Sequence, residues 1–190
     1  MMPEGTRLVT RAVRFAAERH ADQRRKGLRQ HPYFNHLAEV ADLLSEAIEG
    51  DDAALIAAAY LHDTIEDTQT GIDELRAQFG PDIASLVMEV TDDKSLPKME
   101  RKRLQIVTAP KKSPRAKLLK IADATSNVRT LTLDPPTDWD TDRMQDYVDW
   151  AGQVISHCRG SNPVLDAAFD AAAAEARTAI KARMAEGANA

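Results

Sequence analysis

Apolar residues recur along almost the whole chain at the spacing of an α-helix. In the segment 6–21 they stand at positions 8, 9, 12, 13 and 16, on one face of a helix. No segment alternates apolar and polar residues as a half-buried strand does, so the pattern predicts an all-α protein. The further helices that the same spacing predicts lie at about 36–49, 53–67, 71–79, 81–90, 98–108, 115–131, 140–158 and 163–184.

Glycine, proline and capping residues support these boundaries. Gly50 ends one helix, and Asp51 or Asp52 can cap the next one. Pro81 is well suited to a first helical position, where its missing N–H costs nothing. With such boundaries the pattern predicts about eight to ten helices.

The basic segment 22–35 contains a glycine and a proline and interrupts the helical pattern. We expect a loop there, with room for one short β-hairpin near residues 24–34. No stretch rich in Pro, Gly or Ser divides the chain, so a single domain, 1–190, is predicted. A flexible tail is expected from about residue 185.

Composition narrows the class of protein. Alanine is abundant, and the 190 residues are 43% hydrophobic and 29% charged, as in a soluble helical domain. A formal net charge of -5 argues against a nucleic-acid-binding protein. The longest uncharged apolar run, Ala53–Leu61, is far shorter than the roughly 20 residues that span a membrane. The one cysteine, Cys158, excludes an intrachain disulfide and favours a cytoplasmic location.

The predicted helix 53–67 combines a buried beginning with a polar end. Its first nine residues are apolar on all sides, yet His62, Asp63, Glu66 and Asp67 follow. Acids at a helix C-terminus oppose the helix dipole, and carboxylates near a core need partners. A divalent cation would meet both needs; the alternative is an acidic helix end that faces solvent.

Two further polar residues lie on apolar helix faces. His36 shares a ridge with Val40 and Leu44, and a core histidine with satisfied hydrogen bonds is the alternative to a metal ligand. Asp123 lies mid-helix on an apolar face, where a pair with Lys or Arg is the alternative. Asn127, one turn further on, is placed to bond a water, a ligand hydroxyl or Asp123 itself.

The order His, His-Asp, Asp, here His36, His62–Asp63 and Asp123, resembles the pattern of the HD phosphohydrolase superfamily. Two imidazoles and two carboxylates leave coordination positions open for a water and a phosphate oxygen. Glu66 and Asp67, one turn beyond the ligand pair, are placed to orient that water or to move its proton.

Several longer segments carry a second, more specific pattern. They are Gln23-Arg-Arg-Lys26, Pro32-Tyr-Phe-Asn-His36, Leu61-His-Asp-Thr-Ile-Glu-Asp67, Val90-Thr-Asp-Asp-Lys-Ser-Leu-Pro-Lys98 and Glu100-Arg-Lys-Arg-Leu104. With these segments the chain resembles the small alarmone hydrolases of the RelA/SpoT group, in particular the metazoan SpoT homologues. The resemblance runs from about residue 7 to 165 with almost no change in length.

The resemblance implies an all-helical HD-domain fold and a Mn²⁺-dependent 3′-pyrophosphohydrolase, with one ion per chain. Its small-molecule substrate would be guanosine 3′,5′-bis(diphosphate), which is converted to GDP and pyrophosphate. Neither nucleic acid nor a membrane is an expected partner. By similarity, the metal ligands are His36, His62, Asp63 and Asp123, the catalytic residues are Glu66 and Asp67, and the substrate-binding residues are Arg25, Lys26, Asn127, Tyr147, Lys98 and Arg143.

One departure leaves the substrate open. The family usually has lysine after the last ligand aspartate, where this chain has Ala124. A second hypothesis keeps the metal site but changes the substrate to an adenine alarmone, or to the 2′-phosphate of NADPH, as the resemblance to the metazoan SpoT homologues suggests. A non-catalytic nucleotide sensor is a third. Tyr147 also has a structural alternative as a buried core tyrosine. The chain has no room for a synthetase domain, so a stand-alone hydrolase is expected.

Overall fold

Helices account for nearly all of the regular structure. The computed structural model describes residues 4–187 and, within them, ten α-helices and one 3₁₀ turn, which confirms the all-α prediction. The elements are α1 (Glu4–Arg19), α2 (Phe34–Ala47), α3 (Ala53–Leu61), α4 (Thr64–Asp67), α5 (Ile72–Phe79), α6 (Pro81–Val90), α7 (Lys98–Thr108), η1 (Ala109–Lys111), α8 (Pro114–Leu133), α9 (Thr141–Ser156) and α10 (Pro163–Gly187). The end of the expected flexible tail, 188–190, lies outside the described residues, and α10 continues to Gly187.

Short polar residues cap the helices that position the site. The side chain of Asp52 accepts a hydrogen bond from the Leu55 N–H at 2.9 Å at the start of α3. Ser113 caps α8 in the same way, and Pro114 follows it at the first helical position. Asp52 was one of the two capping residues that the sequence suggested, and this prediction is confirmed.

The predicted helix 53–67 is interrupted at His62 and Asp63. The α-helix α3 ends at Leu61, and α4 begins at Thr64, although both intervening residues keep right-handed helical backbone angles. Side chains bond the carbonyls of the last turn of α3: His62 Nδ1 lies 2.7 Å from the Ala59 oxygen, and the Thr64 hydroxyl donates to Leu61. Such bonds compete with the backbone ladder. The break turns Asp63 out of the regular helix beside His62.

The basic loop between α1 and α2 forms only part of a hairpin. Its two arms pair through Arg25 N–H to His31 O at 2.9 Å and Tyr33 N–H to Gln23 O at 2.9 Å. Within the described residues this amounts to a single antiparallel bridge between Arg24 and Pro32, without named strands. The proline has no N–H to extend the ladder.

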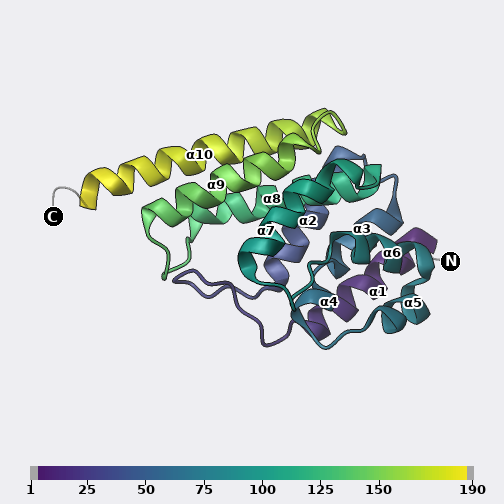
Figure 1. The fold of residues 1–190 in the computed structure, drawn as a ribbon. Coiled ribbons are helices and arrows are strands. Elements are labelled where there is room, and N and C mark those ends of the chain that lie inside the picture. The colour runs from purple at the N-terminus through teal and green to yellow at the C-terminus, as the bar shows by residue number, and fades with distance from the viewer. Residues whose placement is uncertain (1–3, 188–190) are drawn as a thin grey trace.

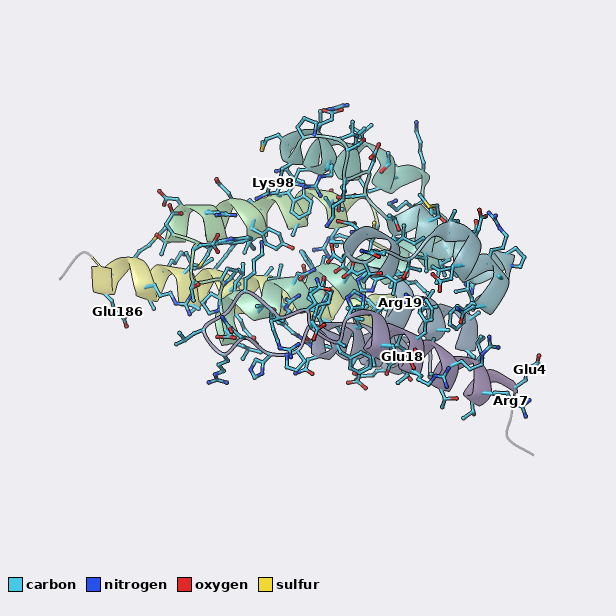
Figure 2. The ribbon with its side chains drawn as sticks, turned by 90° about the horizontal axis from the view of Figure 1, so that it is seen from below. Glu4, Arg7, Glu18, Arg19, Lys98 and Glu186 are labelled. Atoms are coloured by element: carbon cyan, nitrogen blue, oxygen red, sulfur yellow. The ribbon has the colours of Figure 1, made fainter. Side chains whose placement is uncertain are left out.

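The core joins two groups of helices (Figure 1). In one group α3 packs against α1, α2 and α6; in the other α8 packs against α9 and α10, and α2 touches both α3 and α8. Because α3 is apolar on all sides, it can be surrounded by other helices. Lys98 begins α7, where that helix approaches α9 (Figure 2). Among the described helices, none combines the length and the apolar composition needed to cross a bilayer.

Candidate metal centre and active site

His62 stands at the end of α3 with both ring nitrogens buried. Its Nδ1 lies 2.7 Å from the backbone oxygen of Ala59, which can only accept a hydrogen bond. In the neutral ring Nδ1 therefore carries the proton, and Nε2 presents a lone pair. That Nε2 lies 3.1 Å from Asp63 Oδ2 and 3.8 Å from Asp123 Oδ1.

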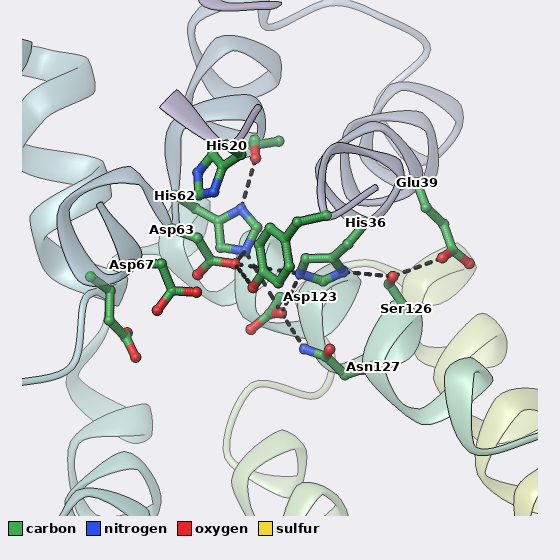
Figure 3. Close-up of polar contacts among 12 residues, drawn as sticks. His20, His36, Glu39, His62, Asp63, Asp67, Asp123, Ser126 and Asn127 are labelled. Carbon is green, nitrogen blue, oxygen red and sulfur yellow. Dashed lines mark hydrogen bonds and ion pairs between the residues drawn. The ribbon is translucent and has the colours of Figure 1, made fainter. Parts of the chain in front are cut away.

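His36, from the first turns of α2, approaches the same two carboxylates. Its Nε2 lies 3.6 Å from Asp63 Oδ2 and 3.4 Å from Asp123 Oδ1. One ligand atom each from His36, His62 and Asp123 lies within 4.8 Å of the others. The structure thus brings all four predicted ligands together, from α2, the α3–α4 junction and α8 (Figure 3).

The surroundings of these two imidazoles fit a divalent cation. The Nε2 atoms of His36 and His62 are buried and have no hydrogen-bond partner. A lone pair facing a carboxylate oxygen repels it unless a proton or a cation lies between them. Two imidazole nitrogens with carboxylate oxygens form a donor set typical of Mn, Fe or Zn.

The pKa values of the residues in this cluster also indicate a site for positive charge. Burial opposes charge on His62, but Asp63 and Asp123 raise its pKa well above the usual value. Burial likewise opposes ionisation of Asp63, yet the adjacent His62 holds its pKa below the usual range. Burial lowers the pKa of His36. The cluster therefore stabilises two carboxylates and attracts positive charge.

The surroundings of Asp123 show the lysine pair that the sequence left open and leave its other oxygen in a position compatible with a metal ligand. Its Oδ2 accepts from Lys120 Nζ at 3.1 Å, so the lysine pair exists. Its Oδ1 faces the two imidazoles and accepts from Asn127 Nδ2 at 2.7 Å. Despite burial, Lys120 and the imidazoles hold the pKa of Asp123 well below its usual range. A carboxylate has two oxygens, so the two roles are compatible.

Glu66 and Asp67 follow the ligand pair on α4. Glu66 Oε2 accepts from the Asp92 N–H at 3.1 Å, and Arg101 lies 3.8 Å from its other oxygen. Asp67 Oδ2 accepts from Gln23 Nε2 at 3.0 Å, and Lys94 pairs with its other oxygen. Burial raises the pKa of Glu66, and the nearby Asp63 carboxylate acts in the same direction. Glu66 thus holds a proton more readily than an ordinary glutamate.

A cavity of about 400 Å³ opens beside Asp67. Of the six predicted substrate-binding residues, Arg25, Lys26, Asn127 and Tyr147 line it. Lys98 and Arg143 are not among its lining residues. Lys98 nevertheless interacts electrostatically with both Arg143 and Lys26, since burial and then these two cations lower its pKa.

The geometry of this cavity suits a nucleotide. The Arg25 guanidinium donates to Asn127 Oδ1 at 3.1 and 3.2 Å and to Thr130 Oγ1 at 2.7 Å. Trp139 offers an aromatic lining, and Arg143 lies 4.5 Å above its ring. Burial raises the pKa of Tyr147, so this phenol stays a hydrogen-bond donor at neutral pH.

The loop that carries Arg25 and Lys26 is fixed to the chain after α8. Gly27 forms a bridge with Pro136, and the Thr137 N–H donates to Lys26 O at 3.2 Å. A Cβ at Gly27 would lie 2.4 Å from the backbone oxygen of Asp134, which cannot rotate away, so only glycine allows this approach. The basic loop is thereby held against the cavity.

Several functional neighbours were not singled out from the sequence. The Tyr33 hydroxyl donates to Asp63 Oδ2 at 2.6 Å, and Gln23 and Lys94 hold Asp67. All three residues lie in the segments that resemble the alarmone hydrolases, so the resemblance could have identified them from the sequence. Trp139 lies outside those segments, and no motif marked it.

Comparisons with known proteins agree with this geometry. Residues 12–149 match the model of an HD-domain family, described as "HD domain". A guanosine-3′,5′-bis(diphosphate) 3′-pyrophosphohydrolase of Xenopus tropicalis, MESH1, is 46% identical over 169 residues, which cover 89% of this chain and 94% of that protein. The human MESH1 is 47% identical over 158 residues, 83% of this chain and 88% of that one.

A solved structure is similar over nearly the same length. It is that of a metazoan orthologue of SpoT, described as hydrolysing ppGpp and playing a role in starvation responses. The TM-score is 0.85 at 42% identity, over 90% of this chain and 96% of the other. The helices, the converging ligand residues and the relatives support one assignment: the chain belongs to the MESH1 family of HD-domain proteins.

Proposed function

We propose that the chain is a Mn²⁺-dependent 3′-pyrophosphohydrolase that converts guanosine 3′,5′-bis(diphosphate) to GDP and pyrophosphate. The observation that carries the proposal is the pair of buried, unpartnered Nε2 atoms of His36 and His62, facing two carboxylates beside a cation-lined cavity. The relatives that cover most of the chain bear the name of this activity, which supports the choice of substrate.

His36, His62, Asp63 and Asp123 would hold the ion. A divalent cation bound there supplies positive charge for the phosphate oxygens and a bound water of lowered pKa. Asp67 is held by Gln23 and Lys94, so its orientation is fixed. We infer that Asp67 orients the attacking water and that Glu66 accepts its proton, a role suited to its raised pKa. The water oxygen forms a bond to the phosphorus that is attached to the 3′-oxygen, and the bond from this phosphorus to the 3′-oxygen breaks. The 3′-oxygen takes up one proton, which balances the proton that Glu66 accepts from the water.

The cations around the cavity would hold the rest of the substrate. Arg25 presents a planar guanidinium beside Asn127 and Thr130, a geometry suited to phosphate or to the face of a base. Lys26, Lys98 and Arg143 form a group of like charges that a 5′-diphosphate would neutralise.

The function is tested with a panel of nucleotides and purified protein, with and without Mn²⁺. We expect pyrophosphate release from guanosine 3′,5′-bis(diphosphate) that requires the metal. Faster pyrophosphate release from the adenine alarmone, or faster orthophosphate release from NADPH, would replace the guanine substrate but keep the site. Tight nucleotide binding without turnover would contradict the enzyme assignment.

Mn²⁺ binding should release about one proton per ion at neutral pH. In the metal-free protein Asp63 and Asp123 raise the pKa of His62 well above its usual value despite burial, so we expect its ring to hold a proton that a ligand imidazole must lose. Calorimetry of Mn²⁺ binding in buffers of different ionisation enthalpy measures the proton count. The release should diminish as the pH rises through the pKa of His62. A binding enthalpy that is the same in every buffer at neutral pH would contradict this linkage.

Replacing both Lys98 and Arg143 by alanine should raise KM for the substrate and leave kcat nearly unchanged, because two positively charged side chains are lost. A charge-assisted hydrogen bond is worth roughly 1.5–3 kcal/mol, and solvent exposure reduces this, so we expect a rise of about tenfold. Steady-state kinetics of the double alanine variant measure it. Lys181→Ala, an exposed lysine on α10, is the matched control. An unchanged KM would exclude these two residues from substrate binding.

A further inference from the structure

A chain of polar contacts leads from the back of His36 to the surface. His36 Nδ1 lies 2.8 Å from Ser126 Oγ, and Ser126 donates to Glu39 Oε2 at 2.7 Å (Figure 3). Arg129 pairs with the other oxygen of Glu39 at 3.2 Å. The contacts join α2, which carries His36 and Glu39, to α8, which carries Ser126 and Arg129.

The chemistry of these groups fixes the direction of each hydrogen bond. The Arg129 guanidinium can only donate, and the Glu39 carboxylate can only accept. Ser126 has one hydroxyl hydrogen, which goes to Glu39. Its oxygen must then accept from His36, so His36 Nδ1 carries the proton. The lone pair of His36 is left on Nε2, which faces Asp63 and Asp123.

The two imidazoles are oriented by different means. For His62, the backbone oxygen of Ala59 in its own helix accepts the Nδ1 hydrogen. His36 has no such backbone acceptor and depends on a hydroxyl from another helix, which itself depends on a carboxylate. Partners of this kind set the tautomer, the ring orientation and the basicity of a ligand histidine.

We propose that Ser126 and Glu39 are positioning residues that hold His36 with its Nε2 lone pair toward the divalent cation. The proposal deepens the proposed function, because it rests on His36 being a metal ligand. Neither residue touches the substrate in this account; both act through His36. Ser126 is 1% exposed, so its contact with His36 Nδ1 lies in the buried interior between α2 and α8.

The space around Ser126 permits a conservative variant. His36, Glu39 and Ser126 lie on the wall of a second cavity of about 300 Å³. Ser126→Thr keeps the hydroxyl and adds one methyl group at a residue that lines this space. Ser126→Ala removes the hydroxyl and little volume, so it separates the hydrogen bond from packing.

The test is a titration of metal-free protein with Mn²⁺ alone, in which electron paramagnetic resonance measures the free ion. We expect Ser126→Ala to weaken Mn²⁺ binding about 10- to 100-fold, the range for outer-shell partners of metal ligands. Glu39→Ala should also weaken Mn²⁺ binding. Without the carboxylate, the Ser126 hydroxyl can donate to His36 Nδ1, and the ring proton then moves to Nε2, where it blocks the metal. Ser126→Thr should restore affinity close to that of the unaltered chain.

Glu46→Ala, an exposed glutamate on the same helix α2, is the matched control for the loss of charge. Thermal unfolding of each metal-free variant reports on structure, because a purely structural role lowers the melting temperature without changing affinity in the folded protein. Affinity within about twofold of the unaltered chain in both Ser126→Ala and Glu39→Ala would overturn the proposal.

The proposal and the proposed function fail separately. If His62→Ala loses the ion while Ser126→Ala keeps full affinity, the metal site stands and the positioning role falls. If Ser126→Ala weakens Mn²⁺ binding while the unaltered chain releases no pyrophosphate from guanosine 3′,5′-bis(diphosphate), the positioning role stands and the substrate assignment falls.

Discussion

Replacing Glu66 by Gln should lower kcat for pyrophosphate release by about 10²- to 10⁴-fold, the contribution of a general base in an active site. Glutamine has the same size and can still accept the Asp92 N–H, but it cannot take a proton from water at neutral pH. Asp67→Asn should reduce kcat over the same range, because the amide disturbs the contacts with Gln23 and Lys94 that orient the carboxylate.

Metal content must be measured on the same samples. Both variants should retain about one Mn²⁺ per chain by elemental analysis, since neither residue is among the predicted ligands. Glu175→Gln, an exposed glutamate on α10, makes the same chemical change away from the site. If the Glu66 and Asp67 variants lose the ion as completely as a ligand variant does, the division between catalytic and ligand residues is wrong.

The His62→Ala variant should lose both the metal and the activity. The substitution removes one of two imidazole donors, a greater loss than the 10- to 100-fold weakening typical of an outer-shell change. We expect less than a tenth of the metal content of the unaltered chain, and turnover near the level of metal-free protein. Added Mn²⁺ should raise the melting temperature of the unaltered chain but not that of the variant.

A surface histidine provides the comparison. His157 is exposed at the end of α9, and His157→Ala should keep metal, activity and the stabilisation by Mn²⁺. Retention of a full equivalent of tightly bound Mn²⁺ by His62→Ala would mean that the ion binds elsewhere, and the proposed mechanism would fall with it.

The ligand residues were visible in the sequence because each violates a local pattern. His36 and Asp123 lie on apolar helix faces, and His62 and Asp63 end an apolar helix, so each needed an explanation. Periodicity alone does not show that α2, α3 and α8 converge. The prediction that they converge came from the family resemblance, which rests on the order His, His-Asp, Asp. The structure places the four side chains together.

Other features depend on contacts that no local pattern reports. The break at His62–Asp63 escaped prediction because the helical backbone angles continue through it, and side-chain bonds to carbonyls interrupt only the ladder. The role of Ser126 depends on Glu39, which is 87 residues away in the chain. Trp139 reaches the cavity from the segment between α8 and α9, which has no helical periodicity to interpret.

The most direct test of the central claim is the anomalous diffraction of crystals grown with Mn²⁺. The account predicts one strong peak, about 2 Å from the Nε2 atoms of both His36 and His62 and from oxygens of Asp63 and Asp123. A fully occupied Mn²⁺ elsewhere in the molecule, with no peak between the two imidazoles, would contradict it.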